Sequence, residues 1–68
     1  MYEIELFKPS DINSKRVFNQ INKLILSGVK SNEIGLCMHF LTDNTQSILD
    51  QFRNIKNRFA FNRDNTGL

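Results

Sequence analysis

Residues 34–41 read Ile34-Gly35-Leu36-Cys37-Met38-His39-Phe40-Leu41, and this uncharged stretch decides the fold. With a period of two, alternate residues share one face, which is typical of a strand: Ile34, Leu36, Met38 and Phe40. With a period of 3.6, one face of a helix is formed instead by Ile34, Met38 and Leu41. The strand predicts a small sheet covered by helices, whereas the helix predicts a three-helix cluster.

The segment before this stretch has the apolar spacing of an amphipathic helix that ends near Ser27. Its apolar stripe is formed by Val17, Phe18, Ile21, Leu24 and Ile25. Residues suited to cap its N-terminus are Ser10, Asp11 and Ser14. Gly28 follows the helix, as expected for a left-handed terminator.

The segment after the stretch predicts a second helix. Asp43 and Gln46 match a capping box, in which each side chain satisfies a free backbone N–H group. The same helical spacing then continues through Ile48, Leu49, Phe52, Ile55 and Phe59. We expect this helix to end near residues 58–61, with a short strand over residues 59–62 as the alternative.

The first residues predict a half-buried strand, because Tyr2, Ile4 and Leu6 alternate with Glu3, Glu5 and Phe7. Proline cannot donate a hydrogen bond to a sheet, so Lys8-Pro9 ends the strand.

Turn-forming residues at 31–32 and 42–44 favour a strand over 34–41, and Gly35 costs about 1 kcal/mol relative to alanine inside a helix. We therefore predict a single α+β domain over residues 1–62 with the order β-α-β-α. Two amphipathic helices should cover one face of a two- or three-stranded sheet, with a right-handed crossover between any parallel strands. Two strands make a poor sheet, so a third is expected from the C-terminal phenylalanines or from a second copy of the chain. Residues 63–68 are expected to fray.

The alternative is an all-α, three-helix fold. Residues 28–35 resemble the stretch that opens the second helix of many bacterial helix-turn-helix domains, and residues 44–48 resemble the start of a recognition helix. The resemblance implies DNA binding. The interval from Glu33 to Ile48 is about three residues longer than the usual short turn between such helices allows.

Composition excludes several classes of protein. The chain has 68 residues, 40% hydrophobic residues and a net charge of +2, which fits one globular domain. It has no apolar run near the roughly 18 residues that span a bilayer. The acids at Glu3 and Glu5 do not fit a signal peptide. A single cysteine, Cys37, fits a reducing compartment such as the cytoplasm.

Cys37 and His39 are the residues with the most reactive side chains, and on a strand they share a face. A Cys–His pair activates a nucleophile only in direct contact and usually with a third, orienting group. Two ligands also fall short of the four in a structural zinc site, although a zinc ion shared across a symmetric dimer is geometrically conceivable. The expectation is a buried thiol and a half-buried imidazole, with no enzyme activity, no metal and no cofactor.

Two sets of residues are candidate binding surfaces. Apolar residues predicted to lie outside the core form a candidate protein-binding surface: Phe7, Ile12, Leu26, Cys37 and Leu41. Cations on the helices form a candidate nucleic-acid surface: Lys15, Arg16, Lys23, Arg53, Lys56, Arg58 and Arg63.

The functional prediction is a small, non-enzymatic interaction protein, such as an inhibitor, adaptor or regulatory subunit. It would bind a protein partner or itself, with no role at a membrane. Its size and Asn-rich composition are compatible with a phage or mobile element. The alternative is a nucleic-acid-binding transcriptional regulator that uses a basic helix face.

Overall fold

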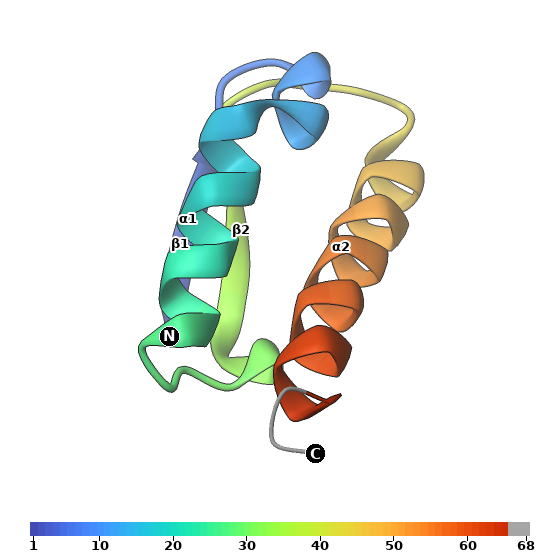
Figure 1. Cartoon of the computed structure of the whole chain (residues 1–68). Helices are drawn as coiled ribbons and strands as arrows, with labels where there is room; N and C mark the ends of the chain where they lie inside the picture. The colour runs from blue at the N-terminus through green and yellow to red at the C-terminus, as the bar shows by residue number, and fades with distance from the viewer. Residues whose placement is uncertain (66–68) are drawn as a thin grey trace.

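A computed structural model describes the backbone of residues 1–65 and the side chains of residues 1–60. The elements along the chain are β1 (Tyr2–Leu6), η1 (Pro9–Asn13), α1 (Lys15–Leu26), η2 (Ser31–Glu33), β2 (Ile34–Met38) and α2 (Thr45–Asn65). Apart from the two short 3₁₀ helices η1 and η2, this is the predicted β-α-β-α order (Figure 1). The α+β prediction is confirmed, and the three-helix alternative is wrong because residues 34–38 form a strand.

The two strands pair in parallel, with a register that runs from Tyr2 opposite Ile34 to Leu6 opposite Met38. Helix α1 connects them and lies in front of β1 in Figure 1, with β2 to its right, so the crossover is right-handed. The predicted extra strand from the C-terminal phenylalanines is wrong, since residues 59–62 belong to α2. The described part of the chain therefore has a two-stranded sheet.

Of the three residues predicted to cap helix α1, the last in the sequence does so. Ser14 is its N-cap, and the Ser14 hydroxyl accepts a hydrogen bond from the Val17 N–H group at 3.3 Å. After the helix, Gly28 has a φ of 100°, the left-handed conformation predicted for it. The Val29 N–H group then donates to the Leu24 carbonyl at 3.0 Å, which satisfies one of the free carbonyls at the helix end.

Ile12 was expected to be exposed on helix one, and this is wrong. It lies in η1, where the tighter 3₁₀ turn points its side chain into the core, and it is 2% exposed.

Helix α2 also differs from the prediction at both ends. Asp43 is not its N-cap, because α2 begins at Thr45 and Asn44 therefore takes that position. The Gln46 side-chain amide donates to the Asp50 carboxylate at 3.0 Å. The helix continues to Asn65, beyond its expected end at residues 58–61. Residues 63–65 of the predicted frayed tail are therefore helical, and residues 66–68 lie outside the described part of the chain.

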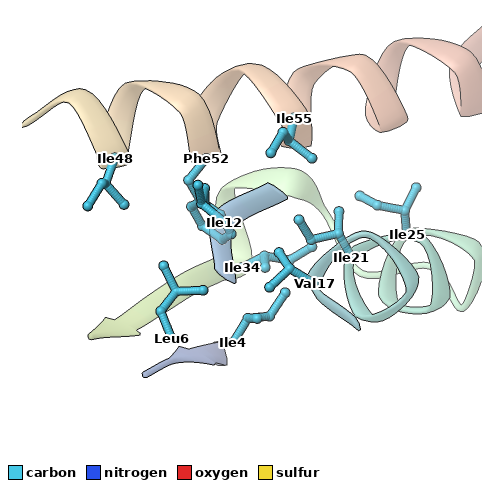
Figure 2. Close-up of a cluster of buried hydrophobic side chains, with 10 residues drawn as sticks. All are labelled: Ile4, Leu6, Ile12, Val17, Ile21, Ile25, Ile34, Ile48, Phe52 and Ile55. Atoms are coloured by element: carbon cyan, nitrogen blue, oxygen red, sulfur yellow. The ribbon is translucent and has the colours of Figure 1, made fainter. Parts of the chain in front are cut away.

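One hydrophobic core lies between the sheet and the two helices (Figure 2). Side chains from β1 and β2 point toward α1 and α2, which pack against each other and against the same face of the sheet. The buried residues are Ile4, Leu6, Ile12, Val17, Ile21, Ile25, Ile34, Ile48, Phe52 and Ile55. Both helices thus cover the same face of the sheet, and neither covers the opposite face.

Candidate functional site

The face of the sheet opposite the helices is the candidate functional site, and we call it the open face. Side chains alternate along a strand, so the burial of Ile4 and Leu6 against the helices turns the intervening residues of β1 outward. In a parallel sheet, paired residues lie on the same face. The partners of these β1 residues in β2, and His39 directly after β2, therefore also point outward. The open face is formed by Glu3, Glu5, Phe7, Gly35, Cys37 and His39.

Asp11 fixes the turn that presents Phe7 at the end of β1. Its carboxylate accepts hydrogen bonds from the N–H groups of Phe7 at 2.8 Å and Lys8 at 3.1 Å. The Arg16 guanidinium lies 3.7 Å away. The hydrogen bond from Phe7 is the main reason that the pKa of Asp11 lies below its ordinary value of 3.8, with smaller contributions from Lys8 and Arg16.

We expect Asp11→Asn to reduce the loss of stability at low pH. Because the folded-state pKa of Asp11 is lowered, its stabilising effect is complete above the ordinary value of 3.8 and is lost as the pH falls through the lower folded-state value. Urea unfolding near neutral pH and near pH 3 should show a smaller difference for the variant than for the wild type. Equal differences for the two proteins would contradict this role of Asp11.

Phe7 forms a small exposed cluster with His39. Their rings are stacked, with centroids 4.9 Å apart and planes 11° from parallel. The Arg16 guanidinium lies 5.9 Å from the Phe7 centroid, within range of a cation–π contact. The Phe7 side chain is nevertheless 59% exposed, so the open face presents an aromatic surface to whatever binds there.

His39 also contacts two other residues of the open face. Its Nε2 atom lies 3.6 Å from the Cys37 sulfur and 3.7 Å from a Glu5 carboxylate oxygen. In a nucleophile–histidine–carboxylate relay, the nucleophile and the carboxylate contact opposite ring nitrogens. Here both contact the same nitrogen, so Glu5 does not orient His39 for activation of Cys37. The prediction of no enzyme activity, made from the sequence, remains a prediction.

Each free edge of the sheet has a cation bound to one of its carbonyls. The His39 N–H group donates to the Leu6 carbonyl at 2.9 Å, and successive carbonyls of a strand alternate in direction. The Glu5 carbonyl therefore points to the free edge of β1, where Arg16 donates to it at 2.8 Å. By the same alternation, the Ile34 carbonyl lies on the free edge of β2, where the Lys56 ammonium donates to it at 2.7 Å.

Lys56 is partly buried in this position, and its ammonium lies 4.8 Å from the centroid of the Phe52 ring. Burial lowers the pKa of Lys56, and the nearby positive charge of Arg53 lowers it further. The sequence gives no sign of this contact, because residues 34 and 56 are brought together only by the packing of α2 over β2.

The residues predicted to bind a protein partner lie in different parts of the structure. Phe7 and the partly buried Cys37 are on the open face. Leu41 is fully exposed in the loop after β2, at the same end of the sheet as Phe7. Leu26 is 69% exposed but ends α1, outside the open face. Ile12 is buried in the core and is not available to a partner.

The cations predicted to bind nucleic acid do not form one free surface. Arg16 and Lys56 donate to main-chain carbonyls, and Arg53 lies 3.5 Å from the Asp50 carboxylate. Three others of the predicted cations are exposed: Lys15, Lys23 and Arg58. The side chain of Arg63 lies outside the described residues. Nucleic-acid binding remains a prediction, and it has less support than the binding of a protein at the open face.

A hollow of about 330 Å³ lies between η1, the loop after β2 and the start of α2. Its residues come from three separate segments, so no local sequence pattern predicts it. Its polar lining is uncharged and consists of Ser10, Asn13, Thr42, Asn44, Ser47 and Gln51. Nothing in this lining selects a particular class of ligand.

Within residues 1–65, neither helix has the length and apolar character needed to cross a bilayer. The described side chains, those of residues 1–60, include no group of three or more histidine, cysteine, aspartate or glutamate residues that could hold a metal ion. No protein-family model, curated protein or solved structure matches this chain.

Proposed function

We propose that the protein is a small, non-enzymatic interaction module that binds another polypeptide chain through the open face, and that a second copy of itself is this partner. The observation that carries the proposal is the placement of both helices on one face of the sheet. The other face is left with a stacked and exposed aromatic residue, Phe7.

The size of the sheet supports burial of this face. A two-stranded sheet is marginal by itself, and a chain of this length has little core with which to stabilise it. A second copy packed on the open face would remove Phe7 from water and give the sheet a second covering layer. Aromatic residues with partly polar surroundings are also common at the centres of protein interfaces.

The strand edges are less suited to binding a partner than the open face. An added strand needs the free N–H and C=O groups of an edge. Arg16 and Lys56 each bind one of these carbonyls, at Glu5 and Ile34, and charged side chains at sheet edges oppose strand addition. The proposal therefore places the partner on the open face and away from both edges.

We expect Phe7→Glu to abolish self-association. It replaces the main apolar contact of the open face with a charge that would have to be buried. Sedimentation equilibrium over a range of concentrations should show the wild-type mass rising above the 8.0 kDa of one chain, while the variant stays at that mass. High salt should not prevent wild-type association, whereas binding to nucleic acid would weaken steeply.

Leu26→Glu is the matched control, since it also places an acid at an exposed apolar position but lies outside the open face. This variant should associate like the wild type. Equal loss of association in both variants, or a wild-type mass of 8.0 kDa at every concentration, would contradict the proposal.

A further inference from the structure

Cys37 and His39 are spaced like two ligands of one tetrahedral metal ion. Zinc lies about 2.3 Å from a cysteine sulfur and about 2.0 Å from a histidine nitrogen, which at a tetrahedral angle separates the two atoms by about 3.5 Å. The observed separation between the Cys37 sulfur and His39 Nε2 is 3.6 Å. Both atoms can therefore reach one zinc ion without a change of the strand.

The surroundings hold the two ligands in this arrangement. Cys37 is in β2 and His39 directly follows it, with its N–H group bonded to the Leu6 carbonyl. The imidazole is also held in place by stacking on Phe7. A pair that is held in position before the metal arrives loses little freedom on binding.

One chain supplies only half of a zinc site. A structural zinc ion takes four ligands, and no group of three or more suitable residues is found among the described side chains of residues 1–60. The open face is where the proposed function places a second copy, and a two-fold axis through this face would bring the same pair of ligands from that copy.

We propose that one zinc ion binds between two open faces, held by Cys37 and His39 of each chain, with each thiol releasing its proton to solvent. The proposal rests on the proposed function, because it names a metal-bridged second copy as the partner. Cysteine and histidine together select zinc over the hard cations magnesium and calcium.

The charge of the open face opposes association of two copies without a metal. Glu3 and Glu5 lie on this face, and a Glu5 carboxylate oxygen is 3.7 Å from His39 Nε2. Two copies brought face to face would bring four such carboxylates together. The two thiolates balance the charge of the Zn²⁺ ion, so the metal–ligand bonds must overcome this repulsion, and association should be stronger with the metal than without it.

The test uses the full chain, reduced and freed of metal. Zinc is added, and mass is followed by sedimentation velocity and stoichiometry by native mass spectrometry. We expect one zinc ion per two chains and a doubling of mass that a chelator reverses. Cobalt in place of zinc should show the visible bands of a tetrahedral thiolate site.

The variants Cys37→Ser and His39→Asn should each lose metal uptake and metal-dependent dimerisation. The control variant Glu33→Gln should keep both, because Glu33 is an exposed residue outside the open face.

Three results of the zinc titration would overturn the metal site. These are the absence of zinc uptake, one zinc ion on a single chain, and a dimer that forms equally with chelator present. The last result, combined with normal association of Cys37→Ser and none for Phe7→Glu, would leave the proposed function standing while removing the metal. A dimer that only a reductant dissolves would be a disulfide-linked pair and would also overturn the inference. Circular dichroism of each variant shows whether it is folded.

Discussion

Replacing Phe52 with alanine is expected to lower the free energy of unfolding by about 3 to 5 kcal/mol. Phe52 is 3% exposed and lies in the middle of the α2 surface that covers the sheet. A chain of this size has a total stability of only about 3 to 10 kcal/mol, so much of the variant should be unfolded at room temperature. Urea unfolding followed by circular dichroism measures the difference.

The control for this prediction is Phe7→Ala. It removes the same atoms from a side chain that is 59% exposed. The loss should stay below about 1 kcal/mol, because it involves mainly the stacking contact with His39. Similar losses for the two phenylalanines would mean that the core does not lie where Figure 2 places it.

Replacing Lys56 with methionine is the second large change, with an expected loss of about 1 to 2 kcal/mol. Methionine retains much of the apolar contact with Phe52, but it cannot donate a hydrogen bond to the Ile34 carbonyl. The free edge of β2 then lacks its bound cation. We therefore also expect the variant to aggregate more readily than the wild type on prolonged storage, as measured by light scattering.

Arg58→Met is the matched control, since it removes a cation two residues further along the same helix at an exposed position. Its stability should change by less than about 0.5 kcal/mol. If Lys56→Met were as stable as Arg58→Met, the hydrogen bond to Ile34 would contribute nothing to the fold.

The elements with regular apolar spacing could be predicted from sequence, because burial of one face explains their pattern. The stripe of α1 at Val17, Ile21 and Ile25 is buried as predicted. The strand at 34–38 carries conflicting sequence signals, because leucine and methionine favour helices. Turn residues on both sides and the complete alternation of apolar residues indicated the correct structure.

The errors arose where local geometry departs from an α-helix or where distant residues meet. A 3₁₀ turn directs Ile12 to a different side than an α-helix would, which the sequence spacing does not reveal. The contact of Lys56 with Ile34 depends on how α2 crosses β2. The proximity of Glu5 to His39 was hidden for a similar reason, since it requires knowing that the two strands pair in parallel and in which register.

The parallel register also has a consequence for the speed of folding. Each pair in the sheet joins residues 32 positions apart, as with Tyr2 and Ile34, so no pair can form through a short hairpin. Closing the loop between the two strands costs conformational entropy before the strand pairing contributes any stabilising free energy. Helix α1 lowers this cost, because it forms locally and shortens the flexible part of the loop. We expect the strand pairing to be the late, rate-limiting event, and changes in α1 to affect the folding rate more than changes at exposed positions of α2 such as Arg53 and Asn57.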